Sequence, residues 1–369
     1  MAHLKKQLRI IIAGGGTGGH IFPAIAIANA IKAQQPATEF LFVGAKGKME
    51  MEKVPQAGYK ITGIDIAGFN RSSLLKNIAL PFKLLKSYFQ VRGIIADFMP
   101  DAVIGVGGYS SFPVLRFAQG KNIPVFIHES NSFAGKANQW LGKKATKVFT
   151  ATTGMEQFFP ASKIIITGNP VRRNIAESVI TRSEGLAFFK LEETKPTVLV
   201  TGGSLGAKGI NDAIAAQLDE LLQNNVQLIW QTGKPFAATA KKLCEGKTDV
   251  WTNDFIMQMA YAYAAADVVV SRAGAMAIAE LCVVKKPAVL VPFPFAAEDH
   301  QTVNAQNLVN KQAAILIKDA AATKELVPAL LQLLSSQQQQ QTLKNNIEAL
   351  AVTNADEIIA KAILKELEQ

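Results

Sequence analysis

Cysteine is scarce in this chain of 369 residues, which contains only Cys244 and Cys282. Their separation fits no metal-ligand spacing, and two cysteines cannot build the disulfide framework of a small secreted protein. The sequence therefore predicts a reducing, cytoplasmic environment without a cysteine-based metal centre. Histidine is nearly as rare, with four in the whole chain, so each histidine near a predicted loop is of interest.

Long apolar runs are also absent. The N-terminal segment is basic at Lys5, Lys6 and Arg9, but the apolar run that follows ends at Gly14, too early for a signal peptide. No uninterrupted apolar run reaches the ~18 residues that a membrane-spanning helix needs. Any membrane contact is therefore expected to be peripheral.

Acidic residues are fewer than basic ones, 29 against 39, which gives a formal net charge of +10. This balance indicates an anionic partner: a nucleic acid, a phosphorylated substrate or an acidic membrane surface. The interleaved aromatic and basic residues of an RNA-binding sheet are not evident, so no nucleic-acid partner is predicted. The length and the 49% hydrophobic content suffice for two domains with cores of their own.

The first glycine-rich stretch predicts a strand over 10–13, a tight loop and a helix. Its Gly14-x-Gly16-x-x-Gly19 spacing matches the dinucleotide fingerprint, but Glu39 precedes the second strand, over 40–43, instead of ending it. The loop's reactive side chains are Thr17 and His20. Three interpretations stay open: a nicotinamide or flavin site, a structural turn, and a loop that faces a phosphate or a sugar.

Two later strands predict further polar groups at the same edge of a parallel sheet. The strand over 102–106 runs into a glycine loop that carries Tyr109, and the strand over 123–127 ends in His128, Glu129 and Asn131. In open α/β sheets, ligands bind at the carboxyl ends of the strands. His128 is equally well explained as a buried structural histidine, whereas an acid at a strand end is costly unless it faces solvent or a ligand.

Gly168 and Pro170 interrupt the regular pattern, and the order of strand, glycine loop and helix then begins again in the second half of the chain. We therefore place a domain boundary after residue 168. In the second half, Ser204 lies in a glycine loop suited to a diphosphate, and Glu280 lies on the helix after the strand over 267–271. A carboxylate there can accept both ribose hydroxyls, which is the favoured interpretation; the alternative is a helix-surface glutamate. The sequence further predicts a last strand over 287–295, an exposed turn at the glutamine run 337–341, and a terminal helix over 356–368.

One segment stands apart by its charge. Between Arg71 and Ala96 there is no acidic residue, and basic residues alternate with leucine, isoleucine and aromatic residues. Such a segment can lie on an anionic bilayer. A helix that packs on its own sheet and presents a solvated basic face explains the pattern equally well.

Seven motifs follow one another in an order that resembles the MurG family of glycosyltransferases. No single motif is decisive, but the ordered set extends over nearly the whole chain and is specific. The motifs are Gly15-Gly-Thr-Gly-Gly-His20, Gly107-Gly-Tyr-Ser110, His128-Glu-Ser-Asn131, Gly168-Asn-Pro-Val-Arg172, Gly202-Gly-Ser204, Ser271-Arg-Ala-Gly-Ala275 with Glu280, and Asp299-His-Gln301 with Asn304-Ala305.

The resemblance implies a GT-B fold, in which two Rossmann-like α/β domains face a cleft. Residues 1–168, with the last helix 354–369 packing back, would form the acceptor and membrane domain, and 169–353 the donor domain. The implied reaction is the inverting transfer of N-acetylglucosamine from UDP-N-acetylglucosamine to the 4-hydroxyl of undecaprenyl-diphospho-N-acetylmuramoyl-pentapeptide. It belongs to peptidoglycan synthesis, needs no cofactor and takes place at the cytoplasmic face of the membrane.

The resemblance also implies roles for individual residues. His20 and Glu129 are the two candidate bases, and Tyr109, His128 and Asn138 would contact the acceptor. In the donor site Glu280 would hold the ribose, Ile256 the uracil and Gln301 the sugar. The phosphates would be bound by Arg172, Ser204, Ala275, Met276, Ala277, Ile278 and Ala279. From the first domain, Thr17, Gly18, Gly19 and Asn131 would close over the donor.

The sequence departs from the commoner family pattern at three places: Leu205 where glutamine often stands, Ser130 inside the His-Glu-x-Asn cluster, and the segment 133–139, which keeps Asn138 but has Gln139 instead of arginine. The chain has no Asp-x-Asp pair to hold a metal, so helix dipoles and Arg172 are expected to stabilise the leaving diphosphate. Two alternatives remain: a UDP-sugar transferase for another lipid such as diacylglycerol, and a non-catalytic nucleotide-sugar binding protein. The first would lack the first-half motifs, and the second would be expected to have lost His20 and Glu129.

Overall fold

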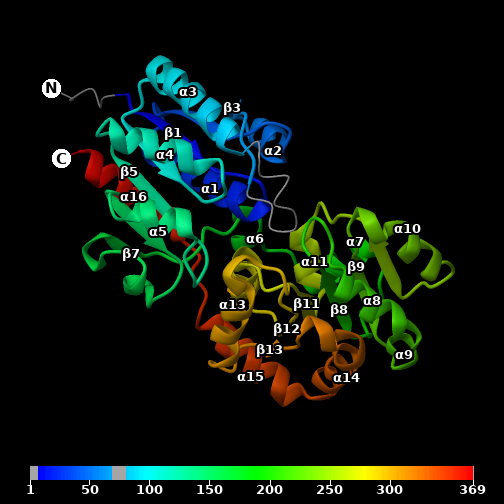
Figure 1. Cartoon of the computed structure of the whole chain (residues 1–369). Helices are drawn as coiled ribbons and strands as arrows, with labels where there is room; N and C mark the ends of the chain where they lie inside the picture. Colours follow the sequence, from blue (N-terminus) through cyan, green and yellow to red (C-terminus); the bar gives the residue numbers. More distant parts are fainter. Residues whose placement is uncertain (1–6, 69–79, 369) are drawn as a thin grey trace. The chain divides into compact units, whose positions relative to one another are not determined.

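The computed structural model describes residues 7–68 and 80–368. It divides into two compact units (Figure 1). The first is Met1–Arg172 together with Asn354–Gln369, and the second is Arg173–Thr353. The boundary thus lies four residues after the one placed from the sequence.

The first unit contains a seven-stranded sheet in the order β3-β2-β1-β4-β5-β6-β7, and all its neighbouring strands are parallel. The strands are β1 (Arg9–Ala13), β2 (Glu39–Ala45), β3 (Lys60–Ile64), β4 (Ala102–Gly105), β5 (Val125–Glu129), β6 (Lys147–Thr150) and β7 (Ile164–Ile166). The longer helices are α1 (Gly18–Gln34), α2 (Glu50–Gln56), α3 (Leu80–Phe98), α4 (Ser111–Gly120), α5 (Lys136–Gly142) and α16 (Ala355–Leu367).

The sheet of the first unit has a hydrophobic core on each face, because successive side chains of a strand point to opposite sides. In β1, Ile10 and Ile12 join one core and Ile11 joins the other. The core of Ile10 includes residues of α1 and of α16, among them Ile27 and Ile363. The end of the chain therefore packs on the first unit, with α1 and α16 on the same face of the sheet.

The second unit repeats this plan with a six-stranded parallel sheet in the order β10-β9-β8-β11-β12-β13. Its strands are β8 (Thr197–Thr201), β9 (Gln227–Gln231), β10 (Val250–Asn253), β11 (Val268–Ser271), β12 (Ala288–Leu290) and β13 (Ile315–Leu316). Its helices are α6 (Arg173–Ala176), α7 (Arg182–Phe189), α8 (Lys208–Ala216), α9 (Leu218–Gln223), α10 (Lys234–Leu243), α11 (Met259–Ala265), α12 (Ala275–Val283), α13 (His300–Val309), α14 (Ala322–Ser335) and α15 (Gln337–Glu348). The prediction of two Rossmann-like domains is confirmed.

Three predictions about individual elements are wrong. The apolar pattern at Ile61-Thr-Gly-Ile-Asp-Ile66 predicts a third strand over 61–66, but β3 ends at Ile64, because the backbone N–H of Asp65 leaves the sheet and donates to Gln90 Oε1 at 2.8 Å. The strand predicted over 287–295 is only Ala288–Leu290, and the two-residue β13, which pairs with it, is missing from the sequence-based prediction. Two-residue strands have no recognisable alternation.

The glutamine run is also not a turn, since it forms the start of α15. Ser336 caps this helix, and its Oγ accepts the N–H of Gln339 at 3.2 Å. Leu343 and Ile347, four residues apart, are buried on one face of the helix. Capping and packing therefore place the glutamines on a regular helix, which their side chains tolerate well.

Candidate functional site

The loop between β1 and α1 presents backbone amides at the start of a helix. Gly16 has a φ of +88°, a left-handed conformation that favours glycine. Thr17 is the N-cap of α1, but its side chain makes no capping hydrogen bond, and its residue is exposed. The amides of Gly18 and Gly19 belong to the first turn, where a helix attracts anions.

His20 lies on the first turn of α1, and its ring is tied to the same loop. Its Nδ1 lies 3.0 Å from the carbonyl oxygen of Gly15. A carbonyl can only accept, so Nδ1 carries the hydrogen and Nε2 is the acceptor nitrogen of the neutral ring. The ring packs against Gly107 in the loop after β4, where an added Cβ would come within 2.8 Å of Nε2. The structure therefore gives His20 the tautomer that a general base needs.

Tyr109 follows Gly107 and Gly108, which have φ values of +95° and +83°. Its ring faces the first loop, since an added Cβ on Gly16 would lie 3.7 Å from it. Burial raises the pKa of the Tyr109 hydroxyl, and the negative charge of Glu50 raises it further. The loops after β1 and β4 thus meet, as expected for neighbouring strands of the sheet.

Glu129 ends β5 and is almost completely buried, with 4% of its surface exposed. Its carboxylate accepts hydrogen bonds from Asn138 Nδ2 at 2.8 Å, from the backbone of Asn131 at 3.1 Å and from the backbone of Gly135 at 3.3 Å. Burial raises the pKa of Glu129, and these donors lower it in part. The carboxylate therefore organises the loop after β5 and has little of its surface left for a substrate.

His128, also predicted to contact the acceptor, has no exposed surface. Its Nδ1 lies 3.4 Å from Ser130 Oγ, and burial lowers its pKa to about 4. The side chains of β5 therefore support the loop from within the sheet, and a ligand could reach His128 only if that loop moved.

The buried His128 predicts a pH dependence of stability. The unfolded chain takes up a proton on this histidine below about pH 6.5, whereas the folded chain holds it neutral down to about 4. Its contribution to stability is therefore complete above 6.5 and is lost as the pH falls toward 4, by roughly 3 kcal/mol at most. His128→Gln should flatten the fall in unfolding free energy across this window, measured by urea denaturation at each pH. Parallel pH profiles for variant and parent would contradict this.

Arg172 closes the first unit. Its guanidinium lies over the ring of Phe22 in α1, 4.8 Å from the centroid, and Phe22 also packs against Gly18. A stacked guanidinium near a helix start is well placed to meet an anion. The first unit thus brings together Thr17, His20, Tyr109 and Arg172 around the start of α1.

In the second unit a buried glutamine at the end of β9, Gln231, links the loops after β8 and β10. Gln231 Nε2 donates to the carbonyl oxygen of Gly203 at 2.9 Å, and its Oε1 accepts the N–H of Ile256 at 2.9 Å. Ser204, beside Gly203, is exposed in the loop before α8. The N–H of Ile256 is therefore used within the unit.

Glu280 is not a helix-surface glutamate, because only 7% of its surface is exposed. It lies on α12, and its Oε2 accepts the hydroxyl of Tyr263 at 2.9 Å. Tyr263 comes from α11 and is itself buried. The residues Ala275, Met276, Ala277, Ile278 and Ala279, which lead to Glu280, form the first turns of α12 and are partly exposed.

Gln301 and the loop after β12 complete this edge of the second sheet. Gln301 Oε1 accepts the N–H of Phe293 at 2.9 Å. Arg272 holds the same loop, donating to the carbonyls of Val291 at 3.0 Å and Pro292 at 3.1 Å. Its guanidinium also pairs with Asp319.

The sequence motifs did not indicate the supporting residues, namely Tyr263, Gln231, Asp319 and the buried Glu50. Each of these side chains makes contacts that join different elements of the fold, and none belongs to one of the seven motifs. Only a buried polar residue within an apolar pattern, such as Gln231 at the end of β9, offered a signal.

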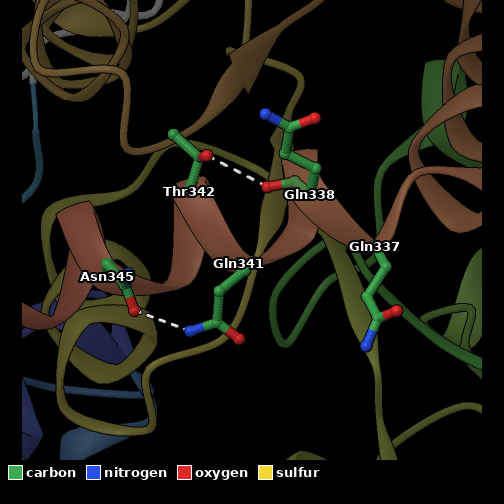
Figure 2. Close-up of a pocket in the computed structure, with 5 residues that line it drawn as sticks. All are labelled: Gln337, Gln338, Gln341, Thr342 and Asn345. Carbon is green, nitrogen blue, oxygen red and sulfur yellow. Dashed lines mark hydrogen bonds between the residues drawn. The ribbon is translucent and has the colours of Figure 1, made fainter.

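Within residues 7–68 and 80–368, no three His, Cys, Asp or Glu side chains gather as metal ligands would, and no helix is long and apolar enough to span a membrane. Figure 2 shows a shallow pocket on α15. Gln341 Nε2 donates to Asn345 Oδ1 at 2.7 Å, and Thr342 Oγ1 donates to the backbone carbonyl of Gln338 at 3.0 Å, and all five lining residues come from this single helix.

Models of known families match both halves of the chain. Residues 10–150 match the glycosyltransferase family 28 N-terminal domain, and residues 197–361 match the glycosyltransferase family 28 C-terminal domain. The two matches cover most of the chain; the first lies within the first structural unit, and the second covers most of the second unit and extends into the terminal segment that packs on the first.

Curated relatives match this chain over nearly their full length. A protein of Parabacteroides distasonis named UDP-N-acetylglucosamine–N-acetylmuramyl-(pentapeptide) pyrophosphoryl-undecaprenol N-acetylglucosamine transferase is 50% identical over 99% of this chain and 100% of its own. A protein of Porphyromonas gingivalis with the same name is 47% identical over 99% of this chain and 97% of its own.

Solved structures agree with these matches. The crystal structure of MurG from Acinetobacter baumannii has a TM-score of 0.77 and 30% identity, covering 97% of this chain and 99% of that one. The kitacinnamycin glycotransferase has a TM-score of 0.74 at 14% identity, covering 98% of this chain and 100% of that one, which indicates a shared fold alone.

Proposed function

Because the chain belongs to glycosyltransferase family 28, we propose the following account of its reaction and of the residues that perform it. The protein is an N-acetylglucosamine transferase with the GT-B fold. It moves N-acetylglucosamine from UDP onto the N-acetylmuramoyl-pentapeptide that undecaprenol carries through a diphosphate, a step of peptidoglycan synthesis. The observation that carries this assignment is 50% identity over 99% of the chain to a transferase of that name.

The donor is assigned to the second unit. The carboxylate of Glu280 accepts the ribose hydroxyls, and the carbonyl oxygen of Ile256 accepts the N–H of uracil. The exposed loop at Ser204 and the first turn of α12 bind the diphosphate, since both precede or begin a helix and so offer backbone amides to an anion. Gln301 and its loop are assigned to the hydroxyls of the sugar.

The acceptor and the base are assigned to the first unit. Inverting transfer forms a bond between the 4-hydroxyl oxygen and the anomeric carbon, breaks the bond from that carbon to the diphosphate, and releases the hydroxyl proton to a base. His20 takes this proton on Nε2, because Nδ1 already bears a hydrogen that Gly15 accepts. Glu129 is the organiser of its loop, given the four hydrogen bonds its carboxylate accepts from Asn131, Gly135 and Asn138.

The leaving diphosphate gathers negative charge as the bond breaks. The start of α12 and the guanidinium of Arg172 are the positive groups that we assign to it, in a site where fixed dipoles need no reorganisation. Tyr109 and Asn138 are assigned to the acceptor side.

A lipid-linked acceptor implies a membrane contact, and α3 has the surface for it. Its buried side, with Ser87 and Val91, faces the unit, whereas Phe82 is 75% exposed and Phe89 is 60% exposed. The further exposed side chains on this half of the helix are Lys83, Leu84, Leu85, Lys86 and Tyr88. Residues 71–79 of the predicted basic segment lie outside the described residues. We assign this outer face of α3 to the anionic cytoplasmic surface of the membrane.

Exposed apolar side chains insert into the membrane–water interface, and each lysine near an anionic membrane contributes about 1 kcal/mol to the binding free energy. Replacing Lys83 and Lys86 with glutamine should therefore weaken binding to phosphatidylglycerol vesicles by about thirtyfold in a sedimentation assay. Turnover of a short-chain acceptor should stay near the parental value.

The matched control replaces Lys241 and Lys242, two exposed lysines of α10, with glutamine. This pair should leave vesicle binding within about twofold. Equal loss in both double variants would mean that the net charge, and not α3, attracts the membrane.

The acceptor class is tested by the release of UDP from UDP-N-acetylglucosamine in the presence of different acceptors. A short-chain diphospho-N-acetylmuramoyl-pentapeptide lipid should stimulate release strongly, and diacylglycerol should not. Stimulation by diacylglycerol alone would move the assignment to a different lipid transferase.

A further inference from the structure

Glu50, the first residue of α2, is a buried acid to which neither the motifs nor the proposed donor and acceptor contacts give a role. Only 1% of its surface is exposed, although glutamate is seldom buried without partners. Its Oε1 accepts the N–H of Ala45 at 2.9 Å, and its Oε2 accepts the N–H of Gly16 at 2.8 Å. Both oxygens thus accept backbone hydrogen bonds, and one of them holds the glycine loop.

The bond to Gly16 connects Glu50 to His20. The N–H of Gly16 and the C=O of Gly15 belong to one planar peptide group. That carbonyl oxygen lies 3.0 Å from His20 Nδ1 and accepts its hydrogen. A carboxylate, a peptide group and an imidazole therefore form a chain of two hydrogen bonds.

Three glycines make room for this chain. A Cβ on Gly15 would overlap the carboxyl group of Glu50, and a Cβ on Gly44 would overlap its Cγ. A Cβ on Gly107 would come within 2.8 Å of His20 Nε2. The loops around Glu50 and His20 thus fit the two side chains closely and leave their hydrogen bonds little freedom.

We propose that Glu50 is a positioning residue that acts on His20 through the Gly15–Gly16 peptide, an inference that rests on His20 being the base. The carboxylate polarises the peptide and strengthens its carbonyl as an acceptor. This fixes the tautomer with Nε2 unprotonated and stabilises the imidazolium that forms when Nε2 takes the acceptor proton. The proton on Nδ1 stays in place, and none moves to Glu50. In serine proteases a carboxylate fixes the tautomer of the histidine and stabilises its imidazolium by direct contact.

The test is a double-mutant cycle on the full chain. Glu50→Gln should lower kcat about tenfold, with the dissociation constant of UDP within twofold of the parent. The same change in a His20→Ala background should lower the residual kcat less than twofold, because its route of action is already gone. Glu52→Gln, on the same helix but exposed, is the control and should leave kcat unchanged.

The cycle separates this proposal from a merely structural role. If Glu50→Gln only loosened the loop or the fold, it would lower the residual activity of His20→Ala by a further tenfold, and the proposal would be overturned. An unchanged kcat in the single Glu50→Gln variant would overturn it as well. If His20→Ala itself kept the parental kcat, the assignment of the base would fail first, which distinguishes the two failures.

Discussion

His20→Ala should lower kcat by about a hundredfold to ten-thousandfold, which is the usual contribution of a general base. The reason is geometric: Nδ1 donates to Gly15 at 3.0 Å, so the ring offers Nε2 as the proton acceptor. The affinity for UDP should change little, because none of the contacts assigned to UDP involves His20. Steady-state kinetics with a short-chain acceptor, and calorimetric titration with UDP, measure the two quantities separately.

His20→Asn is the variant that separates a base from a binding group. Its side-chain amide can still donate to Gly15, but it cannot take a proton. We expect it to be as slow as His20→Ala. A small change in kcat with a large rise in the KM of the acceptor would instead make His20 a binding residue, and the base would then be sought in Glu129.

Glu280→Ala should weaken UDP binding by about 1.5 to 3 kcal/mol, or roughly tenfold to 150-fold, the range for hydrogen bonds to a charged group. The carboxylate is buried, so little solvent competes for it, and the hydroxyl of Tyr263 holds it at 2.9 Å. Tyr263→Phe removes this hydroxyl and should weaken UDP binding by a smaller factor, about fivefold.

The ribose assignment is tested with 2′,3′-dideoxyuridine diphosphate. Its affinity for the parent should already be low, and Glu280→Ala should weaken it less than twofold further. Tyr59→Phe is the control for the tyrosine change, since this hydroxyl donates to Asn29 at 2.6 Å in the first unit. An equal loss for UDP and for the dideoxy analogue would show that Glu280 supports the fold and does not bind the ribose.

The glycine loops could be predicted from sequence because their signal is local. Gly16 and Gly107 follow buried strands and have left-handed φ values, and both facts are determined by a few neighbouring residues. The placement of Glu129 and Asn131 at the end of a strand followed from the same local pattern. The hydrogen bonds that the Glu129 carboxylate accepts from Asn138 and Gly135 could not be predicted, because they depend on the conformation of the loop after β5.

The supporting residues depend on contacts between distant parts of the chain. Glu50 meets Gly16 across 34 positions, and Tyr263 meets Glu280 across 17. The prediction of a turn at the glutamine run was wrong for a related reason, since the helix that forms there depends on the burial of Leu343 and Ile347. Sequence patterns report which residues face a core, but not which polar groups meet there.

The central claim is tested most directly by following labelled sugar from UDP-N-acetylglucosamine to a short-chain analogue of the lipid acceptor, with the linkage of the product determined by NMR. The account predicts one labelled product, a β-linked disaccharide joined at the 4-hydroxyl of the N-acetylmuramoyl group, with its diphosphate and pentapeptide intact. Label that stays in the water-soluble fraction, or a product with an α linkage, would contradict it.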